Sequence, residues 1–472
     1  MKVRDGNDLK AFFEPESVAV FGSLRDGMGL GYGTIRNMLD FGFKGRVYPV
    51  NHNYSEVLGL KAYAAVSEIA EPIDLAVVIT PARTVPEIID QCAQKGVKAA
   101  VIVSEHFAEA GEKGARLQQQ LVDIAHRTGI RIMGPNTIGT LNTANGLVTT
   151  PYLLGYDSIQ KGGIAYCSQS GIVAAQCQPL EDRAYPISKM CDLANKCDVN
   201  EVDILNYLAD DPETKVVAMH MEDVRDGHGF MDAARKLTAR KPLLIFRPAR
   251  SEAGARASAS HTGSLAGNDE VYDSAIKQVG AIRVHTWQEF WEIPRIFAQQ
   301  RQIGGNRLAI IAYSGGAGVV AADAAAEAGL ALANFAPATL DRLRRIDHRA
   351  ARNPIDLGPI LSAAADTVSV QDEAIAAILE DDSVDCASIA LYVGVLAPVQ
   401  YIDELLERLM ENISKPVTIW LYGTKLSVLE ETSRCLEARG LPVFTELETA
   451  VKALGLLAHY SRFRSNLDHD AA

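Results

Sequence analysis

The sequence lacks an excess of basic residues and lacks long apolar runs. Its 59 acidic side chains outnumber its 46 Lys and Arg, giving a formal net charge of −13 over 472 residues. Nucleic acid and anionic lipid both need a basic surface, so neither is an expected partner. No apolar run reaches the roughly 18 residues of a membrane helix, and the first residues do not resemble a signal peptide. We therefore expect a cytoplasmic protein.

Metal-binding and nucleotide-binding signatures are also missing. The seven cysteines are odd in number and include no CxxC pair, which argues against a zinc site and against a disulfide framework. No GxxxxGK[ST] loop for nucleoside triphosphates is present. The sequence thus predicts no metal ligands in this chain.

One pattern is present three times: an apolar, β-branched run, then a loop rich in Gly and Ser, then a helix-period segment. The runs begin near residues 17, 164 and 308, so each unit spans about 145 residues, a common domain size. The helices are expected from about Thr34, from about Ile172 and up to Gly329. Within each unit, further short apolar strands alternate with helices, which is typical of parallel sheets covered on both faces.

The pattern predicts an α/β protein with three consecutive doubly wound parallel-sheet domains. Polar and Gly-rich breaks place the boundaries. We expect domains at residues 1–148, 149–303 and 304–465, with a frayed tail at 466–472.

The first glycine loop, residues 22–33, predicts a dinucleotide-type site, because glycines let the backbone approach a pyrophosphate. Its spacing differs from GxGxxG. Asn51 ends the second strand where an NAD site normally has an acidic residue. Lys44 and Arg46 lie just upstream and suit a phosphorylated ribose, so CoA and NADP both remain candidates. An NADP-dependent oxidoreductase would also need a hydride-accepting site, which we do not find.

The second domain contains His261 within a segment of small residues, 250–267, that follows a predicted strand and is expected to be a loop. Neutral imidazole can carry a phosphoryl group on nitrogen. Residues 168–171, at an expected helix start, offer N–H groups for such a phosphate. By topology, Glu222 is the nearest carboxylate able to orient the imidazole. A Ser-His-Asp hydrolase is a weaker hypothesis, because Ser168 has no GxSxG sequence around it.

Several of these segments resemble ADP-forming acyl-CoA synthetases, which are relatives of succinyl-CoA ligase. Residues 250–256 and 260–267 are similar to that family's phosphohistidine loop, and residues 168–171 to its phosphate-binding segment. Weaker likenesses complete the match over about residues 10–460: 48–51, 80–81, 134–136, 195–198, 207–212, 314–318 and 353–356. The resemblance implies a Rossmann-like CoA-binding domain followed by two flavodoxin-like domains of the succinyl-CoA-ligase type.

The resemblance also implies roles for individual residues. His261 would be phosphorylated and Glu222 would steady the phosphohistidine, with its phosphoryl group bound by Ser168, Gln169, Ser170 and Gly171. CoA would contact Gly22, Ser23, Arg25, Lys44, Asn51, Thr80, Pro81, Ser104 and Asn136.

The implied reaction makes acyl-CoA reversibly from a small carboxylic acid, CoA and ATP or GTP. Nothing in the chain resembles the ATP-grasp domain that binds nucleotide and Mg²⁺ in this family. A separate ATP-grasp beta subunit is therefore implied, in an α₂β₂ assembly that would also hold the metal.

The sequence departs from the family pattern near the expected thiol end of CoA. Thr137 stands where a cysteine is common, Glu105 and His106 stand where small residues are common, and Asp223 replaces a frequent glycine. In the third domain, Ala317 replaces a usual proline. None of these removes a named catalytic group, but the acyl pocket is expected to be unusual. The alternative function is a non-catalytic CoA-binding regulatory module.

Overall fold

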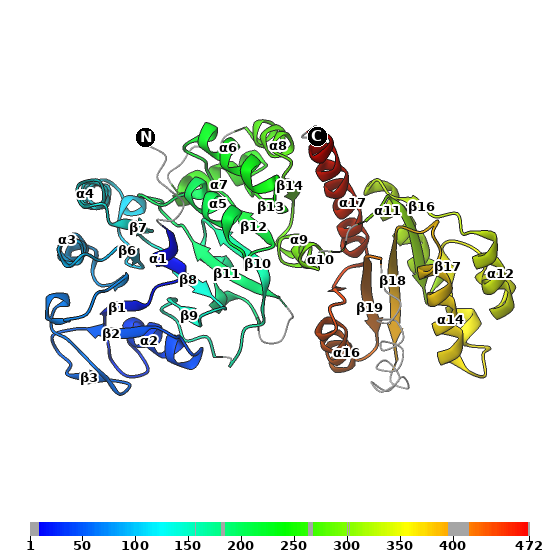
Figure 1. Cartoon of the computed structure of the whole chain (residues 1–472), viewed down its shortest axis with the longest axis horizontal. Helices are drawn as coiled ribbons and strands as arrows, with labels where there is room; N and C mark the ends of the chain where they lie inside the picture. The colour runs from blue at the N-terminus through cyan, green and yellow to red at the C-terminus, as the bar shows by residue number, and fades with distance from the viewer. Residues whose placement is uncertain are drawn as a thin grey trace. The chain divides into compact units, whose positions relative to one another are not determined.

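The computed structural model describes residues 9–155, 157–180, 185–262, 268–299, 301, 303–394 and 415–470, with only the backbone described at 258–262 and 467–470. The chain divides into two compact units, Met1–Phe290 and Trp291–Ala472. Two large sheets lie in the first unit and one lies in the second (Figure 1). Within the ranges described, no helix combines the length and apolar character needed to cross a membrane.

The first sheet has five parallel strands in the order β2-β1-β5-β6-β7. Counted within the sheet this order is 2-1-3-4-5, so the direction of winding reverses between β1 and β5, where such sheets bind ligands. The strands are β1 (Ser17–Gly22), β2 (Arg46–Val50), β5 (Leu75–Ile79), β6 (Ala99–Ile102) and β7 (Arg131–Met133). A small hairpin, β3 (Glu56–Val57) and β4 (Leu60–Lys61), follows β2.

Helices cover both faces of the first sheet, as the apolar strands predict. Val18 and Val20 pack toward the face that carries Ile35, whereas Ala19 and Phe21 pack toward the opposite face. The helical elements are α1 (Lys10–Phe13), α2 (Leu30–Asp40), η2 (Val66–Glu68), η3 (Ala82–Thr84), α3 (Val85–Lys95), η4 (Ala108–Ala110) and α4 (Glu112–Thr128).

The second sheet repeats the same winding and adds two antiparallel strands. Its order is β14-β13-β12-β10-β11-β8-β9, with the reversal between β10 and β12. The strands are β8 (Thr140–Asn142), β9 (Leu147–Val148), β10 (Lys161–Ser168), β11 (Ile187–Asp192), β12 (Val216–His220), β13 (Leu243–Phe246) and β14 (Ile282–Val284). The helices are α5 (Glu201–Asp210), α6 (Gly227–Thr238), α7 (Glu252–Thr262), α8 (Asp269–Gln278) and α9 (Trp287–Glu292). Because β8 pairs with β11 and β9 pairs with β8, the chain enters the second sheet before residue 148.

The second unit contains the third sheet, again wound as 2-1-3-4-5. Its order is β16-β15-β18-β19-β20, with β17 paired to the end of β15. The strands are β15 (Arg307–Ala312), β16 (Ala331–Leu332), β17 (Ile355–Asp356), β18 (Cys386–Val393), β19 (Val417–Gly423) and β20 (Val443–Phe444). The helical elements are α10 (Pro294–Ala298), α11 (Gly315–Glu327), α12 (Pro337–Ile346), η7 (His348–Ala350), α13 (Gly358–Leu361), α14 (Thr367–Leu379), α16 (Leu426–Ala438) and α17 (Leu447–Asp470).

The α/β class with mostly parallel sheets is confirmed, but three local predictions are wrong. The helix expected from Ile172 is replaced by two short 3₁₀ turns, η5 (Gly171–Val173) and η6 (Ala175–Cys177), separated by the extended Ala174. The loop expected around His261 is helix α7, whose four alanines are the strongest helix formers. The predicted frayed tail instead continues α17 as far as Asp470.

A short segment joins the first two sheets. Residues 195–199, between β11 and α5, run beside the chain that leaves β7. Three backbone bonds link them: Asn195 N–H to the Pro135 carbonyl (3.2 Å), Cys197 N–H to Gly134 (3.0 Å) and Val199 N–H to Ile132 (3.0 Å). Arg131 adds buried ion pairs to Asp198 (2.9 Å) and Asp203 (3.2 Å). This joint makes the two domains one compact unit.

We expect Arg131→Met to lower the free energy of unfolding by about 3–5 kcal/mol, because two largely buried carboxylates would lose their cation. Urea unfolding followed by circular dichroism measures the change. Arg127→Met is the matched control, since Arg127 is 62% exposed in its pair with Asp90 and such pairs contribute at most about 1 kcal/mol. Equal losses in the two variants would contradict the role given to the joint.

Candidate functional site

The carboxyl edge of the first sheet gathers most of the predicted CoA-binding residues. Gly22 ends β1, and its carbonyl accepts a hydrogen bond from the Asn51 side-chain amide (2.8 Å). The loop after Gly22 turns back tightly: a Cβ on Gly29 would lie 2.2 Å from the Ser23 carbonyl oxygen, so only glycine fits. Asn51 therefore holds the glycine loop in place at the reversal of the sheet.

The same edge continues across the strands to Asn136. The Ser104 hydroxyl accepts from the Thr80 N–H (3.1 Å), and the Asn136 N–H donates to the Ser104 carbonyl (3.0 Å). Asn136 has a positive φ of 65°, a conformation that non-glycine residues rarely adopt and that is often found at functional sites. Ser23, Arg25 and Pro81 are exposed at this edge as well.

Lys44 is not brought to this edge, so the structure contradicts its prediction as a CoA residue. It lies just before the start of β2, at the opposite end of that strand from Asn51. Its ammonium group donates to the Ala144 carbonyl (3.2 Å). Five residues of strand rise about 16 Å, which is too far for Lys44 to act together with Asn51. The sequence placed Lys44 close to Asn51 along the chain, but it did not show that the two residues lie at opposite ends of β2.

The reversal of the second sheet places Ser168 beside His220. The Ser168 hydroxyl lies 3.0 Å from His220 Nδ1, donates to the Ser170 carbonyl (2.8 Å) and accepts from the Ser170 N–H (2.8 Å). His220 is 3% exposed and its ring packs against Phe246 and Trp287. Burial lowers the pKa of His220 to about 4, so the ring is neutral near pH 7.

Gln169 ties the predicted phosphate loop to the end of β12. Its side-chain oxygen accepts from the N–H groups of Glu222 (2.9 Å) and Asp223 (3.2 Å), and its amide nitrogen donates to the Asp223 carboxylate. The Gln169 N–H itself donates to the His220 carbonyl (3.2 Å). Two of the N–H groups predicted to bind phosphate, those of Gln169 and Ser170, are thus used within the protein. A Cβ on Gly171 would lie 2.6 Å from an Ile138 side-chain carbon, so this position too fits only glycine.

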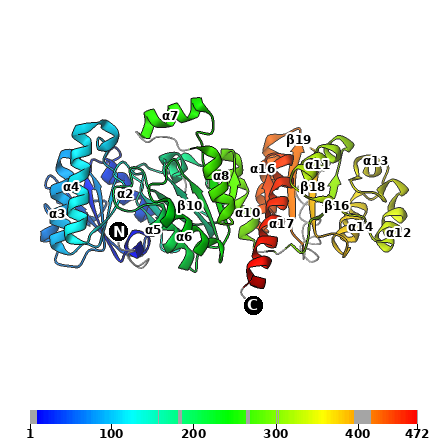
Figure 2. The ribbon, with the colours of Figure 1, turned by 90° about the horizontal axis from the view of Figure 1, so that it is seen from above.

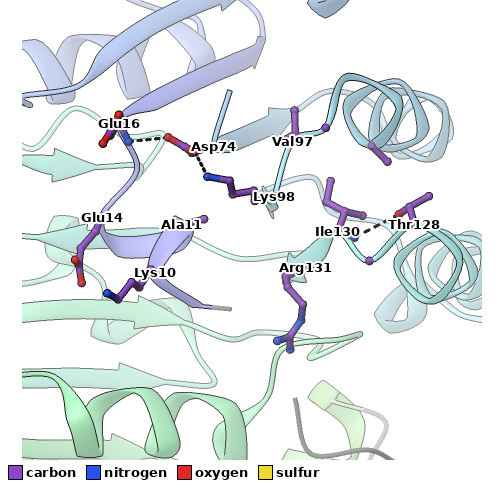
Figure 3. Close-up of a pocket in the computed structure, with 13 residues that line it drawn as sticks. Lys10, Ala11, Glu14, Glu16, Asp74, Val97, Lys98, Thr128, Ile130 and Arg131 are labelled. Atoms are coloured by element: carbon purple, nitrogen blue, oxygen red, sulfur yellow. Dashed lines mark hydrogen bonds and ion pairs between the residues drawn. The ribbon is translucent and has the colours of Figure 1, made fainter. Parts of the chain in front are cut away.

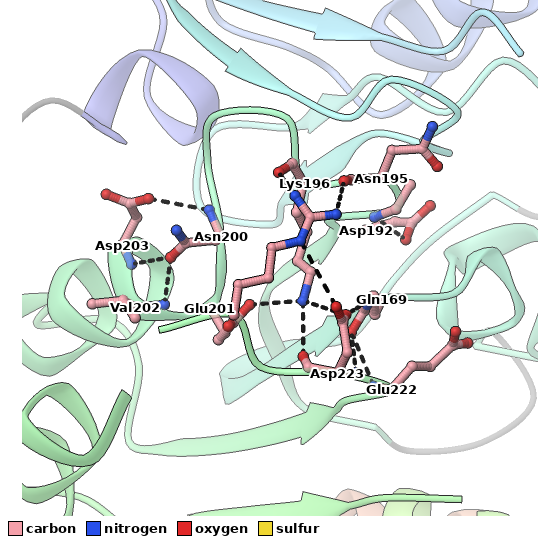
Figure 4. A network of polar contacts seen from close by, with 12 residues as sticks. Gln169, Asp192, Asn195, Lys196, Asn200, Glu201, Val202, Asp203, Glu222 and Asp223 are labelled. Carbon is pink, nitrogen blue, oxygen red and sulfur yellow. Dashed lines mark hydrogen bonds and ion pairs between the residues drawn. The ribbon is translucent and has the colours of Figure 1, made fainter. Parts of the chain in front are cut away.

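A buried cation organises the region next to this loop (Figure 4). Lys196 is 1% exposed and pairs with Glu201 (3.0 Å) and with the Asp223 carboxylate (2.8 Å), and it also donates to the Asp223 carbonyl (2.8 Å). Burial by itself would raise the pKa of Asp223. The bonds from Lys196 and Gln169 outweigh burial and hold that pKa below its usual value. Asp223 is therefore a fixed anion between Lys196 and the phosphate loop.

Asp192, at the end of β11, is a second buried carboxyl group. Burial, with a smaller contribution from the nearby charge of Glu222, raises its pKa to about 7, although the N–H donors of Ile138 (2.9 Å) and Ala194 (3.2 Å) act in the opposite direction. A buried carboxyl group whose pKa is raised toward neutral pH is typical of functional sites, and this one lies beside the predicted phosphate loop.

One cavity of about 260 Å³ joins the ligand edges of the two sheets. Asn136 lines it from the first domain, and Gln169, Ser170 and Gly171 line it from the second. The remaining lining residues are Ala108, Glu109, Gln118, Ile138, Asp192, Ala194, Asn195, Asp223 and Arg225. One residue predicted for CoA, Asn136, and three predicted for the phosphoryl group thus line the same space.

The predicted catalytic pair is described only in part. The backbone of His261 lies in the last turn of α7, and its side chain is outside the described residues. Glu222 follows β12, half-buried, with its N–H fixed by Gln169. Figure 2 shows α7 standing apart from the body of the second domain, and none of the side chains described for it is buried.

Sequence reasoning missed three groups of the site: His220, Asp192 and Arg225. His220 and Asp192 each end an apolar strand, so a polar residue at a strand end was the available signal. Arg225 had no such signal; it reaches the site through bonds to the carbonyls of Lys196 (3.1 Å) and Asn195 (3.2 Å).

A larger cavity, about 890 Å³, lies at the opposite edge of the first sheet, where the strands begin (Figure 3). Within it, the Asp74 carboxylate pairs with Lys98 (2.6 Å) and accepts from the Glu16 N–H (3.0 Å). Ligands of doubly wound sheets bind at the carboxyl ends of the strands, so the smaller cavity is the candidate site.

The low pKa of His220 predicts a pH dependence of stability. Between pH 6.5 and 4 the unfolded chain binds a proton that the folded protein does not, so stability falls as the pH falls. We expect the wild type to lose about 3 kcal/mol more than His220→Phe over this range. Urea unfolding at several pH values measures it, and the difference between the two proteins is expected to be constant above pH 7. A constant difference down to pH 4 would show that the ring is not buried as a neutral base.

Two family models match parts of the chain. Residues 16–143 match the family described as "CoA binding domain", and residues 161–297 match the "Succinyl-CoA ligase like flavodoxin domain". The chain is 34% identical to "Acetate--CoA ligase [ADP-forming] I subunit alpha" of Pyrococcus furiosus, over 97% of this chain and 98% of the relative. It is 35% identical to "Acetate--CoA ligase [ADP-forming] II" of Archaeoglobus fulgidus, over 97% of this chain and 68% of the relative.

A solved structure agrees over the whole length. The dinucleotide-forming acetyl-coenzyme A synthetase 1 of Ca. Korarchaeum cryptofilum, in complex with phosphate and ADP, superposes with a TM-score of 0.89 at 31% identity, covering 99% of each chain. The chain belongs to the ADP-forming acyl-CoA synthetase family, as a subunit of the alpha type.

Proposed function

We propose that this chain is the CoA-binding, histidine-phosphorylated subunit of an enzyme that makes acyl-CoA reversibly from a small carboxylic acid, CoA and ATP or GTP. The observation that carries the proposal is the shared cavity. Asn136, at the CoA edge of the first sheet, and Ser170 and Gly171, at the phosphate loop of the second, line the same space. A thiol and a phosphoryl group must meet at one carbon atom in such a reaction, and this cavity is where the two edges meet.

CoA is proposed to lie along the carboxyl edge of the first sheet. The glycine loop would receive the pyrophosphate, with Gly22 and Ser23 at its start and the exposed Arg25 as the nearby cation. Asn51 would act through the loop that it holds. The chain of CoA would pass Thr80, Pro81 and Ser104 and bring its thiol to Asn136.

The phosphoryl group is proposed to be carried on His261 and received at residues 168–171. The tight packing at Gly171 leaves the backbone close to the cavity, and Ser168 fixes the turn through its bonds to Ser170. Glu222 would accept the N–H of the phosphorylated imidazole and hold its orientation. Since the described side chains of α7 are not buried, moving this helix would sacrifice little packing.

The chemistry divides into three balanced steps. Nucleotide transfers its terminal phosphoryl group to the His261 imidazole, releasing the nucleoside diphosphate. The carboxylate oxygen of the acid then takes that phosphoryl group, which gives acyl phosphate and free histidine. The CoA thiolate attacks the acyl carbon and inorganic phosphate leaves, forming the thioester. A covalent intermediate splits one difficult transfer into easier reversible ones.

The nucleotide and Mg²⁺ are proposed to bind on a separate ATP-grasp beta subunit, in a cytoplasmic α₂β₂ enzyme. A relative named as an alpha subunit is matched over 98% of its length, which supports a partner chain. The alternative, a non-catalytic CoA-binding module, predicts CoA binding without phosphorylation of His261.

We expect Asn51→Leu to weaken CoA binding at least tenfold, because the glycine loop would lose the bond that holds it. Lys44→Leu is the matched control and should change the affinity less than twofold, since Lys44 lies at the other end of β2. Isothermal titration calorimetry with CoA measures both. Loss of binding in the Lys44 variant alone would move the site to the opposite edge.

Phosphorylation is tested by incubating the chain with an acyl-CoA and ³²P-labelled inorganic phosphate, which runs the last two steps in reverse without nucleotide. We expect acid-labile, base-stable label on the wild type and on the control His228→Ala, an exposed histidine on α6, but none on His261→Ala. Label that persists in His261→Ala would place the phosphoryl group elsewhere. CoA binding with no label in any protein, also with the partner and labelled ATP, would favour the regulatory module.

A further inference from the structure

The side of the cavity away from the phosphate loop is polar. Four side chains form it: Glu109, Gln118, Asn195 and Arg225, which we call the polar wall. Asn195 connects them. Its side-chain amide nitrogen donates to Glu109 (2.5 Å) and Gln118 (3.0 Å), and its backbone carbonyl accepts from Arg225 (3.2 Å). The wall thus spans both domains and is built from contacts between them.

Some hydrogen-bonding groups of the polar wall are used within the protein, and others are left for a ligand. The Glu109 carboxylate is occupied, since it also accepts from the N–H groups of His106 (2.6 Å) and Phe107 (2.9 Å). The Gln118 oxygen is occupied by Asn195 and by the Ala108 N–H (3.3 Å). Within the described part of the chain, the Gln118 amide nitrogen and the Asn195 side-chain oxygen have no hydrogen-bond partner. A donor and an acceptor therefore remain for a ligand.

The charges around the cavity disfavour a second negative group on the ligand. Glu109 and Asp223 are anionic, and the charge of Lys196 is already shared between Asp223 and Glu201. Arg225, the cation of the wall, already faces Asp223 (3.8 Å), and it is 61% exposed, so water screens it. A second carboxylate on the ligand would be repelled by the Glu109 carboxylate, and the wall has no buried cation among its four side chains to offset that repulsion.

Size and lining exclude bulky apolar acids. The cavity of about 260 Å³ holds roughly nine water-sized groups, and a phosphoryl group with a thioester would fill most of them. Among the described residues that line it, none is aromatic and one, Ile138, is a large aliphatic residue. An aryl or long alkyl chain would leave the amides of the wall without partners, which is costly.

We propose that the acid used at this site is short and carries a neutral hydrogen-bonding group, such as a hydroxyl, on a carbon one to four positions from the carboxyl carbon. This rests on the proposed function, because it takes the acyl carbon to lie between Asn136 and Ser170. The hydroxyl would accept from the Gln118 amide nitrogen and donate to the Asn195 side-chain oxygen.

Calorimetric titration of the full chain with CoA thioesters tests the proposal. Hydroxyacetyl-CoA and propionyl-CoA have the same number of heavy atoms and differ only in OH against CH₃. We expect hydroxyacetyl-CoA to bind about fivefold more tightly, the effect of one buried hydrogen bond. Succinyl-CoA and benzoyl-CoA are expected to bind more weakly than both.

Two variants test whether the polar wall causes the preference for hydroxyacetyl-CoA over propionyl-CoA. Gln118→Leu should remove the difference between hydroxyacetyl-CoA and propionyl-CoA, while CoA itself binds as to the wild type. Gln119→Leu, an exposed neighbour on α4 that bonds only to Asp123, should keep the difference. If Gln118→Leu does not fold, Glu109→Gln is informative: removing that charge should improve succinyl-CoA binding about fivefold relative to propionyl-CoA.

The outcomes separate this proposal from the proposed function. No binding of CoA or of any thioester would defeat the proposed function. Tight binding of CoA, with propionyl-CoA or benzoyl-CoA equal to or better than hydroxyacetyl-CoA, would overturn the substrate class and leave the proposed function standing. A preference for hydroxyacetyl-CoA that survives in Gln118→Leu would overturn the role of the polar wall.

Discussion

The ammonium group of Lys196 is buried between two carboxylates, and the geometry of the site depends on it. An ammonium without partners at 1% exposure would cost several kcal/mol, so Glu201 and Asp223 must stay in place. Through Asp223 this cation fixes Gln169, and with it the phosphate loop. Its sequence neighbours Asn195 and Cys197 donate backbone hydrogen bonds to the chain that leaves β7. This charged contact acts together with the backbone bonds of residues 195–199 and the ion pairs of Arg131 to hold the ligand edges of the two sheets together.

The three sheets share one winding, and this explains where the ligands are proposed to meet. Each reverses direction between its first and third strands, and the first two reversals carry Gly22 and Ser168. A doubly wound sheet supplies a rigid edge of backbone groups but little side-chain chemistry of its own. The added strands β8 and β9 fasten the second sheet close behind Asn136. The cavity therefore combines two rigid edges, while α7, which carries His261, has no buried side chain among those described and is the part that packs least.

Much of this arrangement was predictable because it is local in the sequence. Apolar runs and glycine loops identified the strands, their ligand ends and the α/β class, and Asn51 was correctly placed at a strand end. The wrong predictions also concerned short segments or single residues. Small residues suggested a loop at 252–262, whereas alanines there form a helix, and Lys44 was read as near the ligand because sequence distance hides which end of a strand a residue occupies. Glycine and two β-branched residues at 171–173 gave 3₁₀ turns instead of the expected helix.

The sequence by itself determined the fold class, the family and the identity of the loops, since hydrophobic periodicity and glycine spacing act over a few residues. Only the tertiary structure decided which of those loops face each other. The contacts of Asn195 with Glu109 and Gln118, and of Lys196 with Asp223, join residues 27 to 86 positions apart. Such bonds form only when packing has removed water from around the charges, because in solvent the same groups gain little from pairing. The shape and polarity of the cavity at these edges therefore come from the packing of two domains and not from any motif.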